Sequence, residues 1–100
     1  MASSPFGAGP IVGQRDIAAR AVYRFEVAAR GGEALRVAAI GDGDTDIDLV
    51  VRDLSGATVC EDRAKDHYPV CTVFPGANGR FGVEIVNHGR VWTRVQILSN

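Results

Sequence analysis

The chain has 100 residues, of which 46% are hydrophobic and 23% are charged, and its formal net charge is -1. This length suits one domain, which buries roughly two-thirds of the surface that its unfolded chain exposes. The balance of acidic and basic residues excludes the strong positive charge expected of a nucleic-acid-binding domain. No apolar run approaches the roughly 20 residues of a membrane helix, so we expect no membrane span.

Residues 1–15 open the chain with mainly small and polar side chains and two prolines, Pro5 and Pro10. Such a stretch is typical of a loosely held segment, and we interpret it as a flexible N-terminal arm or linker. The first ten residues have neither the basic start nor the apolar run of a secretory signal peptide. Residues 16–100 are then expected to form a single folded domain.

Apolar and polar residues alternate with a period of two in the first half of this domain, which indicates strands with one buried face. The alternation covers residues 21–27 and 35–39, and Gly31–Gly32 separates these segments at a spacing that suits a hairpin. A third alternating segment, residues 47–51, follows an acidic loop.

The second half of the domain continues the pattern with shorter segments. Asp53 and Gly56 occupy the first and fourth positions that a type I turn prefers. Further strands are expected at residues 58–60, 70–74, 81–85 and 91–97. Turn signals recur about every 10–12 residues, which favours an all-β fold: an antiparallel sandwich or barrel of seven or eight short strands.

Four aspartates stand at every second position around the acidic loop: Asp42, Asp44, Asp46 and Asp48. In an extended chain such side chains project to one side, where their charges repel one another unless a cation neutralises them. Calcium takes about 6–8 oxygen ligands in flexible geometry and would serve. The run is not an EF-hand loop, because Ile47 stands where that motif requires glycine. The alternative is that the carboxylates are solvated, cap turns, or pair with Arg36 or Arg94.

Cys60 and Cys71 are the only cysteines, with ten residues between them. They are too few for a zinc site of about four ligands, and a redox motif would need Cys-x-x-Cys. Their spacing suits a disulfide across a hairpin loop, which stabilises by about 3 kcal/mol in the chain-entropy model. A disulfide implies an oxidising compartment. The alternative is a pair of buried free thiols.

Motifs of catalysis are not visible in the sequence, so we expect no enzymatic activity. His67 lies in a polar loop and His88 beside a glycine turn, and neither has an evident catalytic neighbour in the sequence. Among the aromatic residues, Tyr23, Phe25 and Phe81 fit buried strand positions. Tyr68 and Trp92 do not, and they are candidates for contact with a ligand.

Residues 41–56 resemble the hallmark of bacterial pre-peptidase C-terminal domains, in which an acidic stretch leads into an Asp-hydrophobic-Asp-Leu strand and a turn that ends in glycine. Residues 23–25 and 32–37 resemble two early strands of that family, and residues 79–87 its late Gly-x-aromatic strand. The paired cysteines match members that carry such a pair. The resemblance covers residues 11–100. The sequence departs from the family pattern at Leu54-Ser55, Phe81 and Trp92.

This resemblance implies a jelly-roll-like β-sandwich that accompanies a secreted peptidase or another exported enzyme and aids its secretion, localisation or substrate attachment. It also implies calcium, with the four aspartates as ligands. We therefore expect a monomeric, non-catalytic accessory domain in a secreted or periplasmic location. Its partners would be a parent enzyme or an extracellular polymer, and not a nucleic acid. The alternative is an adhesive module that binds carbohydrate or protein through exposed Trp92 and Tyr68.

Overall fold

The structure is a computed structural model that describes residues 11–42, 46–63 and 68–99. These described residues form eight β-strands, and they contain no helix that could cross a membrane. The all-β fold predicted from the alternation is confirmed. The strands are β1 (Ile11–Ile17), β2 (Val22–Ala29), β3 (Leu35–Ile40), β4 (Ile47–Arg52), β5 (Thr58–Asp62), β6 (Val70–Val73), β7 (Gly79–Asn87) and β8 (Thr93–Ser99).

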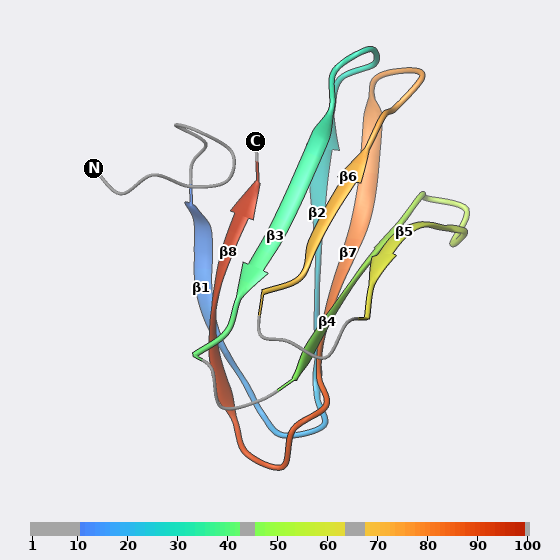
Figure 1. Ribbon diagram of the computed structural model, residues 1–100. Helices are drawn as coiled ribbons and strands as arrows, with labels where there is room; N and C mark the ends of the chain where they lie inside the picture. The colour runs from blue at the N-terminus through green and yellow to red at the C-terminus, as the bar shows by residue number, and fades with distance from the viewer. Residues whose placement is uncertain (1–10, 43–45, 64–67, 100) are drawn as a thin grey trace.

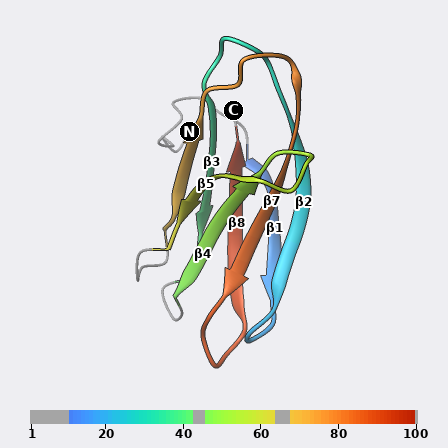
Figure 2. The ribbon, with the colours of Figure 1, turned by 90° about the vertical axis from the view of Figure 1, so that its right-hand side faces the viewer.

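The strands form two four-stranded antiparallel sheets that pack face to face (Figure 1). The first sheet has the order β1-β8-β3-β6, and the second has the order β2-β7-β4-β5. A quarter turn brings β4 and β7 of the second sheet toward the viewer (Figure 2). Every connection crosses from one sheet to the other except the one between β4 and β5. This strand order is that of a jelly roll, so the predicted sandwich is confirmed.

Alternate side chains of both sheets fill the space between them. On β4, Ile47, Leu49 and Val51 are fully buried, and β7 adds Val83 and Ile85 beside them. Burial of each such side chain contributes roughly 1.5–3 kcal/mol. The other buried members of this core are Ile17, Val27, Leu35, Val37, Ala39, Cys71, Val95 and Ile97, while Tyr23, Phe25 and Phe81 pack against it partly buried.

The two open margins between the sheets are closed by different contacts. At one margin the Cys60–Cys71 disulfide joins β5 of the second sheet to β6 of the first. The predicted disulfide is confirmed, but its expected place across a hairpin was wrong, because the chain between the cysteines crosses from one sheet to the other. At the opposite margin Tyr23 stacks on Phe25, and the Arg15 guanidinium lies 5.6 Å from the centroid of the Tyr23 ring.

The N-terminal boundary of the domain lies earlier than the sequence predicted. β1 begins at Ile11 and pairs with β8 as far as Ile17, opposite Thr93. Gln14, Arg15 and Asp16 are consecutive polar residues and all are exposed, so the sequence of this strand does not alternate between apolar and polar side chains. Residues 11–15 belong to the sheet and not to an arm, and residues 1–10 lie outside the described residues.

Because the disulfide ties the two sheets together, we expect its reduction to lower the free energy of unfolding by about 3 kcal/mol. Urea denaturation of the oxidised protein, with and without a thiol reductant, measures this difference. The Cys60→Ala/Cys71→Ala variant is the control, and its unfolding should be insensitive to the reductant. Equal stability of the oxidised and reduced wild type would contradict the stabilising role.

Candidate functional site

The β1–β2, β3–β4 and β7–β8 connections lie at the same end of the sandwich, the lower end in Figure 1. Asn87, which is fully buried at the end of β7, holds two of them together. Its Nδ2 donates to the carbonyl oxygens of Ile17, Ala18 and Val91 at 2.9–3.2 Å. Its Oδ1 accepts a hydrogen bond of 2.8 Å from the N–H of Gly89. The predicted turn after β7 is therefore fixed by a buried amide.

Asp42, the first aspartate of the acidic run, is bound to β8. Its Oδ1 accepts a hydrogen bond of 2.9 Å from the Thr93 hydroxyl, and its Oδ2 accepts one of 3.2 Å from the Arg94 N–H. The β3–β4 connection is thereby tied to the first sheet. Both oxygens of Asp42 have protein donors, so Asp42 is not an open ligand beside Asp46 and Asp48.

Asp48 points away from the core and is nevertheless 4% exposed. Its Oδ2 lies 2.8 Å from His88 Nε2 and 3.3 Å from Arg63 Nη1. Neither Arg36 nor Arg94, the partners considered from the sequence, pairs with it among the described contacts. The sequence did not reveal that His88 and Arg63 are neighbours of Asp48, because they approach it only once β4 has paired with β7 and β5.

Two carboxylate oxygens at the start of β4 have no donor. Asp46 Oδ1 and Asp48 Oδ1 are buried and make no hydrogen bond within the part of the chain that is described. Leaving such a group unsatisfied costs about 1–3 kcal/mol, and more when it is charged. In the same segment the Asp46 carbonyl oxygen accepts a hydrogen bond of 3.0 Å from the His88 N–H. The two oxygens are of the type that a hard cation such as calcium binds.

The predicted set of four calcium ligands is not brought together as one cluster in the described residues. Among residues 11–42, 46–63 and 68–99, no three His, Cys, Asp or Glu side chains form a group that could hold a metal ion. Asp44 lies outside the described residues. Within the described part of the chain, the aspartates of the run with an unbound carboxylate oxygen are therefore Asp46 and Asp48.

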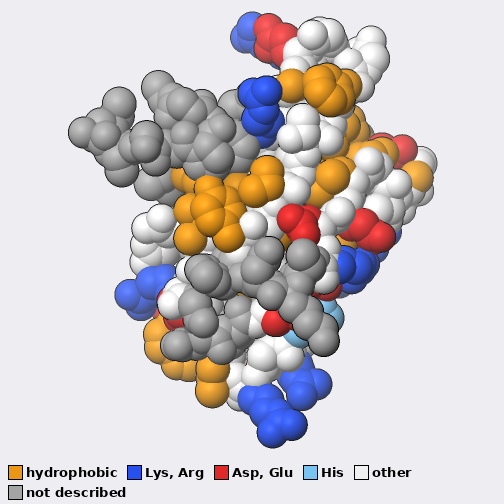
Figure 3. All heavy atoms as spheres, in the orientation of Figure 1, with side chains coloured by type: hydrophobic (Ala, Val, Ile, Leu, Met, Phe, Trp, Pro, Cys, Tyr) orange, Lys and Arg blue, Asp and Glu red, His pale blue; other side chains and the backbone are white. Residues whose placement is uncertain are grey.

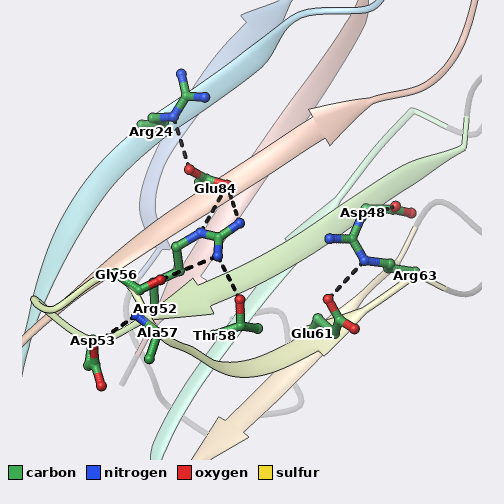
Figure 4. Close-up of polar contacts among 10 residues, drawn as sticks. All are labelled: Arg24, Asp48, Arg52, Asp53, Gly56, Ala57, Thr58, Glu61, Arg63 and Glu84. Carbon is green, nitrogen blue, oxygen red and sulfur yellow. Dashed lines mark hydrogen bonds and ion pairs between the residues drawn. The ribbon is translucent and has the colours of Figure 1, made fainter.

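Charged side chains cover the outer face of the second sheet (Figure 4). Glu84 on β7 pairs with Arg24 at 3.0 Å and with Arg52 at 3.5 Å. The Arg24 guanidinium, through its hydrogen bond, and then the charge of Arg52 lower the pKa of Glu84, although burial of the carboxylate opposes the shift. Arg52 also donates a hydrogen bond of 2.6 Å to the Thr58 hydroxyl. Val50 lies on this outer face, opposite Glu84 on β7 and Glu61 on β5, and is nevertheless only 1% exposed.

Exposed aromatic side chains lie at both ends of the molecule. Trp92, in the β7–β8 connection, is 56% exposed, and the Arg94 guanidinium lies 5.8 Å from the centroid of its ring. Tyr68, just before β6, is half-buried. Phe74 is 79% exposed at the other end, beside a shallow open groove that Leu54 and other apolar residues line. The two candidate ligand contacts from the sequence, Trp92 and Tyr68, are thus accessible to different degrees.

In comparisons with known proteins, no family model matches the chain and no curated protein matches it at a significant level.

The pH dependence of stability should report the Glu84 network. The folded-state pKa of Glu84 is lowered, so its ionised carboxylate stabilises the fold at pH values above the unfolded-state pKa. This stabilisation is lost as the pH falls through the folded-state pKa. We expect wild type to exceed Glu84→Gln by about 0.5–1 kcal/mol at pH 7, since the pair is partly screened by solvent, and we expect this difference to shrink as the pH falls below the unfolded-state pKa.

Urea denaturation at a series of pH values measures both proteins. Glu33→Gln, at an exposed loop position, is the control and should follow the wild-type curve. A constant difference between wild type and Glu84→Gln across this pH range would contradict the assignment.

Proposed function

We propose that this chain is a non-catalytic accessory domain of an exported bacterial protein, stabilised by its disulfide and by calcium bound at the start of β4. Three features support the proposal: the eight-stranded jelly roll, the disulfide between its sheets, and the resemblance of residues 41–56 to pre-peptidase C-terminal domains. A disulfide of this kind is maintained in secreted and periplasmic proteins. Such a location would suit a domain that aids secretion, localisation or substrate attachment of a parent enzyme.

The observation that carries the calcium proposal is the pair of buried oxygens, Asp46 Oδ1 and Asp48 Oδ1, without hydrogen-bond partners in the described residues. Their carboxylates stand two residues apart at the point where the β3–β4 connection enters the second sheet. Asp44 precedes them with the same spacing and would be a third ligand. Bound calcium would supply positive charge to these carboxylates and fix the connection that contains them.

Arg63 and His88 limit how strongly this site could bind calcium. Both already contact Asp48 Oδ2, so part of the negative charge of Asp48 is balanced by protein groups. The cation would therefore take the opposite oxygen of Asp48 together with Asp46. A site with this composition is a stabilising site of moderate affinity, since affinity for calcium rises with the number of uncompensated carboxylates.

Several polar groups that could act in catalysis already have partners within the fold, and this supports the non-catalytic assignment. Both cysteines are in the disulfide, and the Ser55 hydroxyl donates to Asp53 within a turn. The pair of His88 and Asp48 has the geometry of an oriented base, but a base alone performs no acyl transfer without a nucleophile. The pair is better explained as the charge balance of a buried carboxylate.

Calcium should raise the melting temperature of the purified domain. At a calcium concentration 100 times the dissociation constant, binding adds about 2.7 kcal/mol, which corresponds to roughly 10 °C or more for a domain of this size. Circular dichroism melts in calcium and in chelator, at matched ionic strength, measure the shift. Asp46→Asn should remove most of it, because this change removes the charge of one proposed ligand.

Asp42→Asn is the matched control for this experiment. Both oxygens of Asp42 are occupied by β8, so this variant should be less stable at every calcium concentration but should keep the full calcium-dependent shift. Identical melting of the wild type in calcium and in chelator would remove calcium from the proposal. The accessory role and the disulfide would then stand without a metal.

A further inference from the structure

The outer face of the first sheet carries a row of exposed polar side chains that ends at the single tryptophan. In the β1–β8 register, Gln14 lies opposite Gln96, and Asp16 lies opposite Arg94. Trp92 lies two residues before Arg94, in the connection that leads into β8. We call these five exposed residues the polar platform. Since Val95 and Ile97 of the same strand face the core, alternation directs Arg94 and Gln96 to the opposite side.

Trp92 and its neighbours are held in place before any ligand binds. Arg94 forms two hydrogen bonds with Asp16, of 2.8 and 3.3 Å, which is the bidentate geometry that fixes a guanidinium plane. The same guanidinium lies 5.8 Å from the Trp92 ring centroid and orients the indole by a cation–π contact. A pre-oriented aromatic ring loses little conformational entropy when a ligand stacks on it.

Gln14 and Gln96 are the two members of the platform that carry side-chain amides. Both side chains are exposed, and within the described part of the chain no hydrogen bond of either amide group is observed. Each amide offers donors and an acceptor in one plane. The platform thus combines an exposed ring with planar donors and acceptors at a regular spacing along two paired strands.

We propose that the polar platform binds a neutral polysaccharide. Sugar rings present C–H faces that stack on an indole and hydroxyl groups that exchange hydrogen bonds with amide, carboxylate and guanidinium groups. From Trp92 to Gln96 the strand rises by about 13 Å, so the platform would take an oligosaccharide segment and not a single sugar. The inference deepens the attachment role proposed above and rests on it, but it does not depend on calcium.

Charge favours a neutral polymer over an acidic one. Asp16 and Arg94 neutralise each other, and their contact lowers the pKa of Asp16 and raises that of Arg94, so both remain charged at neutral pH. The remaining members of the platform, Gln14, Gln96 and Trp92, carry no charge. Figure 3 shows this side of the molecule, where acidic and basic side chains lie close together and no single sign of charge dominates.

The other exposed surfaces suit this ligand less well. The outer face of the second sheet carries a network of ion pairs around Glu84 (Figure 4). The groove beside Phe74 is lined largely by apolar side chains, and its nearby Asp53 carboxylate is already bound to the N–H groups of Ser55 and Ala57. Of the other polar residues that line it, Arg80 pairs with Glu26 at 3.1 Å, and Asn78 Oδ1 accepts a hydrogen bond of 2.9 Å from the Gly31 N–H. Several of its hydrogen-bonding groups are therefore engaged before a sugar could bind.

Affinity electrophoresis of the whole chain tests the proposal with named polymers: hydroxyethyl cellulose, xylan and laminarin as neutral probes, and polygalacturonate as an acidic one. We expect at least one neutral polymer to retard the protein and polygalacturonate not to. Because Trp92 is the only tryptophan, its fluorescence should change on addition of the retarding polymer. Trp92→Ala should raise the dissociation constant about tenfold or more, while Trp92→Phe keeps part of the affinity.

Phe74→Ala is the matched control, since it removes an exposed aromatic ring at the opposite end and should leave the retardation unchanged. Gln96→Ala should weaken binding without changing the melting temperature. Absence of retardation by all three neutral polymers, or retardation that Phe74→Ala abolishes and Trp92→Ala does not, would overturn the proposal. Calcium-dependent melting reports the Asp46 region separately, so failure of either proposal is distinguishable from failure of the other.

Discussion

The two sheets bury one face each against the other, and the side chains of Leu49, Ile85, Val37 and Val95 meet in that space with almost no exposure. Because side chains alternate along a strand, this burial fixes which residues point outward. A slip of one residue in any strand would exchange core and surface positions. The outward positions of Asp48, Glu84, Arg94 and Gln96 are therefore consequences of where the valines and isoleucines lie.

The two outer faces of the sandwich carry different side chains, and its two ends are built mostly from connections that pass between the sheets. Since all connections but β4–β5 pass between the sheets, both ends of the sandwich collect segments that are distant in sequence. The second sheet carries ion pairs such as Arg24–Glu84, which satisfy one another. On the first sheet the Asp16–Arg94 ion pair lies between the exposed side chains of Gln14 and Gln96 and the exposed indole of Trp92. Among the described residues, the charged groups of the second face are thus paired with one another, whereas the first face presents exposed amides and an indole.

The sequence predicted the strands well because a period of two is a local signal, and it failed where geometry is non-local. Alternation located β2, β3, β4, β7 and β8, but it missed β1, in which Gln14, Arg15 and Asp16 are all polar and exposed. The spacing of two residues also led to the prediction that all four aspartates project to one side of an extended chain. In the structure Asp42 is bound to β8, whereas Asp48 lies in β4. His88, forty residues from Asp48, could be found only from the β4–β7 pairing.

Asp42 connects the two regions to which function is assigned. Its carboxylate accepts hydrogen bonds from Thr93 and from the N–H of Arg94, and Arg94 in turn positions Trp92. The acidic β3–β4 connection is thus joined by one continuous series of contacts to the tryptophan of the polar platform. If one end of such a series is already ordered, less conformational entropy remains to be lost when the other end binds a ligand. A cation that fixes this connection would act on the platform through backbone and ion-pair geometry, without contacting the ligand itself.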